Sequence, residues 1–159
     1  MDQAQLVKAF TATVQASLHG LQSLEPVLRR ESEALTGRDP ELLSQAVQDK
    51  LFQLKALEPS VKARDRLLAA AGLDEGLDGG NRLVEMLDDA DLARDWQELR
   101  ALAQAVAELN DVNAQLASQG QRATRTALGI LTNRPSKDDT YTSLRRKPGA
   151  AARHTLGKV

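Results

Sequence analysis

Few side chains in this sequence are of the types that carry out chemistry. The histidines are His19 and His154, and paired carboxylates occur at Asp88-Asp89 and Asp138-Asp139. Adjacent carboxylates can supply ligands to a metal ion, but no Glu-x-x-His pair accompanies them and the chain has no cysteine. Phosphate-binding and dinucleotide-binding glycine motifs and the G-x-S-x-G nucleophile motif are absent from the sequence. We therefore expect a protein that is not an enzyme, with no catalytic residue, no metal and no cofactor.

His19 supports one catalytic alternative. A helical histidine followed by Gly20 is found in helical phosphotransfer domains, which also place a lysine and a glycine at fixed steps after the histidine. Leu21, Gln22 and Ser23 occupy the next positions here. The favoured interpretation is an exposed helix histidine without a chemical role. Replacing His19 with Gln tests the alternative, because a phosphotransfer bundle would then lose all phosphoryl uptake.

Composition and charge restrict the remaining classes of protein. The chain has 159 residues, 42% of them hydrophobic and only 3% aromatic, which favours a slender helical bundle with a core of Leu, Val and Ala. No apolar run is long enough to cross a membrane, and the first residues lack the pattern of a signal peptide, so we expect a cytoplasmic protein without stable membrane insertion. The net charge is −1, but residues 134–159 carry seven basic and two acidic residues, which leaves −6 on residues 1–133. No broad basic face for nucleic acid is present.

A single long helix positions most of the apolar residues of the C-terminal half. Between residues 92 and 131 no proline occurs, and positions at alternating steps of three and four form a heptad-like seam. A helix of this length spans ~60 Å, and its seam needs a cover from the rest of the chain. The seam positions are Leu99, Leu102, Val106, Leu109, Asn113, Leu116, Gly120, Ala123, Ala127 and Ile130.

Two further helices are predicted to supply that cover. The first begins after Asp2 with a capping box to Gln5 and ends at Thr36, with Gly37 as the C′ residue. The second begins at Pro40 after an Asp39 cap and is closed by Gly72. The predicted seam of the second helix is Leu43, Val47, Leu54, Leu57, Val61 and Leu68. The connection is so short that the two helices must lie antiparallel. Residues 72–81 are expected to form a loop, followed by a short helix at 82–88 and an Asp91 cap, and it stays open whether this short helix merges with the long one.

The sequence thus predicts an all-α fold in which three long antiparallel helices form an elongated coiled-coil-like bundle with a flexible C-terminal tail. The expected division is a helical bundle at residues 1–133 and a flexible basic tail at residues 134–159. Polar residues interrupt the three seams at Glu31, Lys50 and Asn113. Paired or hydrated positions in a thin bundle explain the first two. For Asn113, control of helix register is favoured over a partly open face that serves a partner.

Helix lengths indicate where a partner would bind. The second helix covers ~46 Å against ~60 Å for the long one, so the last turns of the long helix should project beyond their cover. An uncovered apolar stripe implies a partner, although Gly120 and Gly129 leave fraying of this end as an alternative. The predicted substrate-binding residues at this end are Ala123, Ala127, Leu128, Ile130 and Leu131.

Tyr141 is the only tyrosine and lies in the least apolar part of the chain. It has no evident core to join, and a tyrosine buries a large area at low entropic cost when it binds a partner. We therefore expect Tyr141 to be a contact residue, with a chance tail tyrosine as the alternative.

The order and spacing of several short motifs resemble the FlgN-type flagellar export chaperones. The resemblance covers residues 28–141 and includes all three long helices. Its motifs are Leu28-x-x-Glu31-x-x-Ala34-Leu35 followed by Asp39, Leu42, Leu43 and Lys50; Trp96-x-x-Leu99; Leu109-Asn110-x-x-Asn113; and Thr140-Tyr141.

The resemblance implies a cytoplasmic chaperone of type III protein export. Such a protein holds the C-terminal helical segments of the hook–filament junction proteins FlgK and FlgL and delivers them to the export gate. The tail tyrosine, Tyr141 here, is implied as the contact to the gate protein FlhA. The alternative from a different class is a structural coiled-coil adaptor that self-associates through the end of the long helix.

Overall fold

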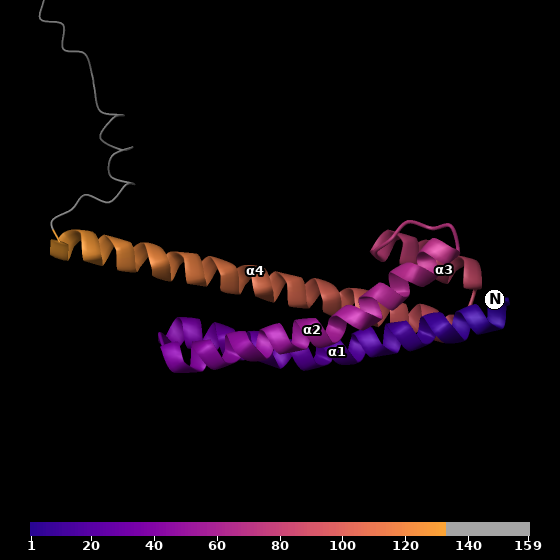
Figure 1. The fold of residues 1–159 in the computed structure, drawn as a ribbon, viewed down its shortest axis with the longest axis horizontal. Helices are drawn as coiled ribbons and strands as arrows, with labels where there is room; N and C mark the ends of the chain where they lie inside the picture. Colours follow the sequence, from indigo (N-terminus) through magenta and orange to yellow (C-terminus); the bar gives the residue numbers. More distant parts are fainter. Residues whose placement is uncertain (133–159) are drawn as a thin grey trace, which may run out of the picture. The chain divides into compact units, whose positions relative to one another are not determined.

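Four helices make up the part of the chain that the computed structural model describes, which is residues 1–132 (Figure 1). They are α1 (Gln3–Gly37), α2 (Pro40–Ala70), α3 (Leu77–Leu87) and α4 (Ala90–Thr132). Within these residues there is no strand, so the all-α helical bundle is confirmed. The prediction of three helices is wrong in one respect, because α3 is a separate fourth helix.

The hairpin of α1 and α2 follows the predicted start signals. The Asp2 carboxylate accepts a hydrogen bond from the Gln5 backbone N–H at 2.7 Å, and the Gln5 side chain accepts one from the Asp2 N–H at 3.1 Å. At the second start, the Asp39 carboxylate accepts from the Leu42 N–H at 3.0 Å. The two helices lie side by side and antiparallel (Figure 1).

The end of α1 differs from the prediction by one residue. Gly37 is the last helical residue, and Arg38 adopts the left-handed conformation with φ 52°. Its N–H bonds to the Ala34 carbonyl, which closes the helix. The next helix is already capped at residue 39, so this single residue makes the whole reversal.

The core is formed mainly by α1 and the first half of α4. Only Ala46 and Leu68 of α2 are buried, although the predicted seam of α2 was longer. Its other apolar positions are half-buried or, like Leu54, exposed. The buried hydrophobic cluster consists of Phe10, Val14, Leu18, Leu21, Leu24, Leu28, Leu68, Leu83, Val84, Leu87, Leu92, Trp96, Leu99 and Val106.

The short helix α3 begins earlier than its glycine-rich sequence suggests. Its start at Leu77 replaces the predicted 82–88 helix, and Gly79 and Gly80 are buried within it. A Cβ atom on Gly80 would lie 2.2 Å from Cζ2 of Trp96, so the absent side chain lets α3 pack directly on the indole. The expected loop is therefore partly a helix whose glycines serve close packing.

The junction of α3 and α4 settles the question of a merged helix. Asp88 adopts the left-handed conformation with φ 50° and ends α3. The Asp89 carboxylate then accepts from the Leu92 N–H at 2.8 Å and caps α4. The predicted cap at Asp91 is wrong, because this residue already lies in the first turn.

The seam of α4 is buried over part of its length. Leu99, Val106 and Asn113 are buried, and the intervening Leu102, Leu109 and Leu116 are half-buried. Residues Met1–Ser118 form one compact unit that contains the core, and α4 continues as a helix to Thr132. None of the helices in the described part of the chain is long and apolar enough to cross a membrane.

Candidate functional site

The last turns of α4 carry exposed apolar side chains. Ile130 is 77% exposed and Leu131 is 81% exposed, the highest values among the large apolar residues whose exposure is described. Ala127 and Ala123, one and two turns earlier, are exposed as well. Leu128 lies in the same helix, but its side chain is outside the described residues. The five predicted substrate-binding residues thus lie on one helix, and the four whose exposure is described are exposed.

Tyr141, the predicted contact to the export gate, lies outside the described residues. The same is true of His154 and of the expected tail at residues 134–159.

The three polar residues that interrupt the seams meet in one network. The Lys50 ammonium donates to Oε1 of Glu31 at 2.7 Å, and Nδ2 of Asn113 donates to Oε2 of the same carboxylate at 3.0 Å. Nδ2 also donates to the Leu28 carbonyl at 2.8 Å. Glu31 of α1 therefore links α2 to α4 through its two carboxylate oxygens.

Burial decides what this network does. The Glu31 side chain is only 7% exposed, that of Lys50 is 20% exposed, and Asn113 is 2% exposed. Oδ1 of Asn113 has no hydrogen-bond partner among the described residues. An amide buried against α1 fixes the register of α4, which favours the register interpretation of Asn113 over an open face.

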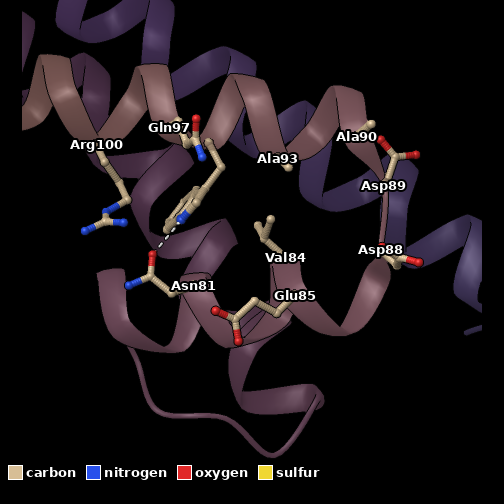
Figure 2. Close-up of a pocket in the computed structure, with 10 residues that line it drawn as sticks. Asn81, Val84, Glu85, Asp88, Asp89, Ala90, Ala93, Gln97 and Arg100 are labelled. Carbon is tan, nitrogen blue, oxygen red and sulfur yellow. Dashed lines mark hydrogen bonds between the residues drawn. The ribbon is translucent and has the colours of Figure 1, made fainter.

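A second feature is the hollow between α3 and the start of α4 (Figure 2). Trp96 is among its lining residues but is only 2% exposed, and its indole packs against Phe10 with ring centroids 5.6 Å apart and an interplanar angle of 41°. The indole donates from Nε1 to the Asn81 side chain at 2.8 Å. Asp88 and Asp89 lie at one end of the hollow and Arg100 at the other, with Glu85 between them (Figure 2). The cavity measures about 420 Å³.

A neighbouring hollow of about 520 Å³ extends along α4. Gln97 and Arg100 line both hollows. The far part of the second one is lined by Leu77 and by small residues of α4, namely Ala101, Ala103 and Ala107.

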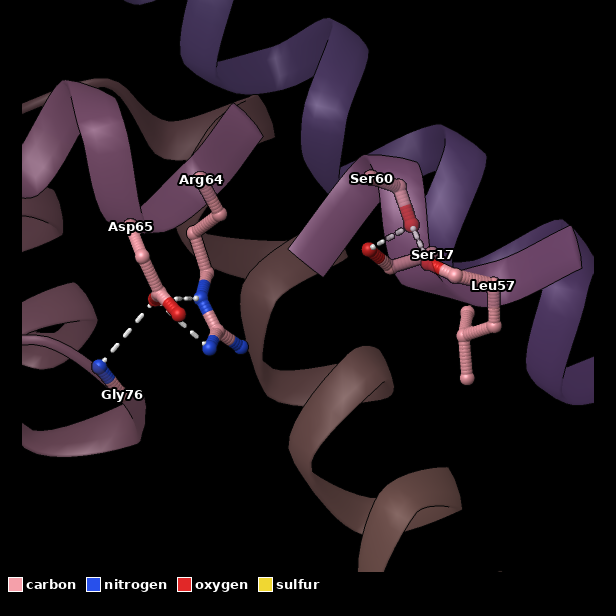
Figure 3. A network of polar contacts seen from close by, with 6 residues as sticks. All are labelled: Ser17, Leu57, Ser60, Arg64, Asp65 and Gly76. Atoms are coloured by element: carbon pink, nitrogen blue, oxygen red, sulfur yellow. Dashed lines mark hydrogen bonds and ion pairs between the residues drawn. The ribbon is translucent and has the colours of Figure 1, made fainter. Parts of the chain in front are cut away.

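Polar contacts hold α2 in place against its neighbours (Figure 3). The Ser17 hydroxyl of α1 donates to the Ser60 hydroxyl at 3.0 Å, and Ser60 donates to the Leu57 carbonyl at 2.8 Å. Near the end of α2, one oxygen of Asp65 accepts from the Arg64 guanidinium at 2.8 Å and from the Gly76 N–H at 3.2 Å. The second contact fixes the loop that leads into α3.

The titratable groups of the described chain show no catalytic arrangement. His19 is exposed on α1, as expected for a histidine without a partner. Within residues 1–132, no group of three or more His, Cys, Asp or Glu side chains is placed to hold a metal ion. Glu58 and Lys62 form an ion pair on the surface of α2, one helical turn apart. The hydrogen bond from Lys62 and its positive charge lower the pKa of Glu58.

Sequence reasoning missed two exposed apolar residues on α2. Phe52 is 70% exposed and Leu51 is 61% exposed. In the sequence, both follow Lys50 by one or two positions and therefore lie off the 3-4 spacing of the predicted seam. That offset could have indicated that the two side chains point away from the core.

Comparison with known protein families decides the identity of the chain. The model of the FlgN family, described as FlgN protein, matches residues 1–147. The chain belongs to the FlgN family. FlgN proteins are flagellar export chaperones, so the matched helices are those of a protein that binds flagellar export substrates. The FlgN match extends beyond α4 and includes Tyr141. No curated protein and no solved structure matches the chain.

Proposed function

We propose that this FlgN-family protein holds the C-terminal helical segments of FlgK and FlgL in the cytoplasm and delivers them to the FlhA export gate. The observation that supports the binding surface is the exposure of Ile130 and Leu131 at the end of a regular helix. In this proposal the substrate-binding residues are Ala123, Ala127, Leu128, Ile130 and Leu131.

Capture of one amphipathic helix by another needs no cofactor and no catalytic group. Each large aliphatic side chain that becomes fully buried contributes about 1.5–3 kcal/mol, so two adjacent residues supply a substantial part of a micromolar interaction. The alanines one and two turns earlier allow the substrate helix to approach the backbone of α4 closely. The exposed face of α4 is therefore suited to a helix with an apolar stripe.

The test is binding of a FlgK C-terminal segment to Ile130→Asp protein, measured by isothermal titration calorimetry. A charge buried in an apolar interface costs several kcal/mol, so we expect the affinity to fall at least about tenfold. Gln121→Asp is the matched control, because Gln121 is an exposed polar residue of the same helix. The melting temperature should stay nearly unchanged in both variants. A sharp drop in the melting temperature of Ile130→Asp would instead show that Ile130 belongs to the core.

The delivery step is assigned to the tail. In this proposal residues 1–133 are the helical bundle and residues 134–159 are the basic tail, whose Tyr141 contacts FlhA. We expect Tyr141→Ala to retain its fold and FlgK binding but to lose recovery of the chaperone–FlgK complex on the FlhA cytoplasmic domain. Equal recovery of wild type and Tyr141→Ala in this pull-down would remove Tyr141 from the mechanism.

The exposure of Ile130 and Leu131 equally supports the adaptor alternative, in which the end of α4 binds a second copy of the chain. Sedimentation velocity with and without the FlgK segment separates the two functions. A chaperone gives a complex that forms only with the segment, whereas an adaptor sediments as an oligomer without it.

A further inference from the structure

The middle of α2 exposes large apolar side chains that the core does not use. Phe52 is 70% exposed, Leu51 is 61% exposed and Leu54 is 44% exposed. Single exposed apolar residues are normal on a protein surface, but residues that gather in one place are typical of an interaction surface. The other exposed large hydrophobic residues described within residues 1–118 are scattered, at Met1, Leu77, Met86 and Val112.

Leu51 and Phe52 lie on the side of α2 opposite its buried residues. At 3.6 residues per turn, Ala46 and Leu68 lie on one side of the helix, and Leu51 and Phe52 flank the middle line of the other side. Leu54 lies at the border between the two sides. The positions that follow this middle line at steps of three and four are all exposed. With Leu51 and Phe52 they form what we call the outer face of α2: Glu41, Ser44, Gln48, Lys55, Pro59, Lys62 and Arg66.

The charge along α2 changes sign at this apolar pair. Residues 39–49 hold three acidic residues and no basic one, a net charge of −3. Residues 50–66 hold five basic and two acidic residues, a net charge of +3. On the outer face, Glu41 precedes the apolar pair, and Lys55 and Lys62 follow it. The helix dipole favours such charges only in the first and last turns, and these lysines lie further inside the helix, which ends at Ala70.

This charge distribution is complementary to itself when a second α2 lies antiparallel to the first. A twofold axis between positions 51 and 52 places position 41 of one copy opposite position 62 of the other, because both lie equally far from the axis. Glu41 then meets Lys62 at each end, and the Leu51 and Phe52 side chains of both copies meet at the centre. Such an isologous contact uses the same surface on both copies. A parallel arrangement would place each charge beside an identical one.

The size of the outer face sets the strength of such a pairing. From Glu41 to Lys62 the face is ~32 Å long, and a helix is about 10 Å wide. The contact is therefore well below the ~800 Å² per partner of a standard stable interface. Two helices of this size form a weak dimer, whose population depends on protein concentration and on salt.

From the exposed apolar pair, the change of charge at its position and the extent of the face, we propose that the outer face of α2 pairs two copies of the chain antiparallel in a weak dimer. Leu51 and Phe52 form the apolar centre of the contact, and Glu41 and Lys62 of different copies attract one another at its two ends. The pairing is independent of the proposed binding of FlgK and FlhA.

Cross-linking tests the antiparallel geometry directly, because the chain has no cysteine. Gln48→Cys and Lys55→Cys proteins are mixed as full chains and oxidised, and the products are identified by mass. Positions 48 and 55 of different copies lie opposite each other in the pairing. Two copies of position 48 lie ~10 Å apart along the helix axes, as do two copies of position 55, beyond the ~7 Å that a disulfide allows between Cα atoms. We expect the mixed disulfide to exceed either homodimer at least about fivefold, whereas the statistical ratio of about two overturns the proposal.

Sedimentation equilibrium of the full chain at low salt tests the apolar centre. The average mass of the wild type should rise as the protein concentration approaches about 1 mM, where even weak complexes form. Phe52→Ser should weaken the self-association at least about tenfold. Met86→Ser is the matched control, because Met86 is 63% exposed on α3, and it should leave the association unchanged. A wild type that stays monomeric at this concentration, or equal losses in the two variants, would overturn the pairing.

Charge reversal tests the ends of the contact. Glu41→Lys places a lysine opposite Lys62 of the second copy, and Lys62→Glu places a glutamate opposite Glu41. Each single change should weaken the association at least about threefold, since it acts twice in a symmetric dimer. The double variant exchanges the two charges and should restore the association to nearly the wild-type value. Losses that simply add in the double variant would contradict the pairing of Glu41 with Lys62.

Two further measurements separate this pairing from the other functions. Ile130→Asp should retain the self-association, because it leaves the outer face of α2 unchanged. Loss of association in Ile130→Asp, but not in Phe52→Ser, would overturn the proposal and assign self-association to the end of α4. Phe52→Ser should also bind the FlgK C-terminal segment as the wild type does. Loss of FlgK binding in Phe52→Ser would show that a substrate helix, rather than a second copy, occupies the outer face.

Discussion

At the scale of single residues, the Glu31–Lys50 pair is the contact with the largest expected energetic consequence. The Glu31 side chain is only 7% exposed, and its carboxylate has one described cationic partner, the Lys50 ammonium at 2.7 Å. Removing one partner of a buried pair leaves an uncompensated charge and typically costs about 3–5 kcal/mol. We therefore predict that Lys50→Met lowers the free energy of unfolding by about 3 kcal/mol, measured by urea denaturation.

The matched control is Lys62→Met, which breaks an exposed pair with Glu58 and should leave the free energy of unfolding nearly unchanged, because solvent screens this pair. Replacing both members, Lys50→Met with Glu31→Met, should recover most of the loss, since no buried charge remains. Equal effects of Lys50→Met and Lys62→Met would show that Glu31 is hydrated rather than buried.

Two glycines of the helices should respond in opposite ways to alanine. A Cβ on Gly80 meets the Trp96 ring at 2.2 Å, whereas a Cβ on Gly120 meets no atom within 4 Å. Gly80→Ala is predicted to lower stability by about 1–3 kcal/mol and to shift the Trp96 fluorescence. Gly120→Ala should instead stabilise the helix by about 0.5–1 kcal/mol, because alanine has the higher helix propensity. Urea denaturation and far-UV circular dichroism measure both, and a neutral Gly80→Ala would contradict the close packing of α3 on Trp96.

At the scale of the elements, the start of α4 provides a test of which aspartate caps it. Asp89 accepts the Leu92 N–H, while Asp91 forms an exposed ion pair with Arg94 at 3.2 Å. Asp89→Ala is predicted to cost about 1 kcal/mol, and Asp91→Ala less than half of that. The two melting temperatures decide between them. A larger effect at Asp91 would favour the cap predicted from the sequence.

Local signals in the sequence were sufficient for the long helices. The Asp2–Gln5 capping box, the Asp39-Pro40 start and the 3-4 seam of α4 each act within a few residues, so spacing alone identifies them. The start of α3 could not be found in this way, because Gly79 and Gly80 were interpreted as loop residues. Gly80 packs against Trp96, which lies 16 residues further along the chain, and such a tertiary contact overrides local propensity.

The site was predictable in parts. Glu31, Lys50 and Asn113 stood out individually as polar residues in apolar seams, but one sequence does not give the register between helices. That these three residues hydrogen-bond to one another could therefore be seen only in the structure. The exposure of Leu51 and Phe52 was missed for a related reason, because the predicted seam of α2 assumed more burial than this helix has.

At the scale of the whole molecule, the chain divides its charge and its apolar surface between different regions. The core belongs to residues 1–118, and the exposed Ile130 and Leu131 belong to the part of α4 beyond them. The proposed chaperone function requires that the last turns of α4 are the part that changes when substrate binds.

Amide hydrogen exchange with and without the FlgK C-terminal segment tests this requirement most directly. Ile130 and Leu131 at the end of α4 are exposed, so the amides of this end should exchange fast in the free protein and slow down once a substrate helix covers them. We predict that protection rises at residues 119–132 and changes little over α1 and α2. Protection that appears on α2 around Leu51 and Phe52, with residues 119–132 unchanged, would contradict the assignment of the substrate site to the end of α4.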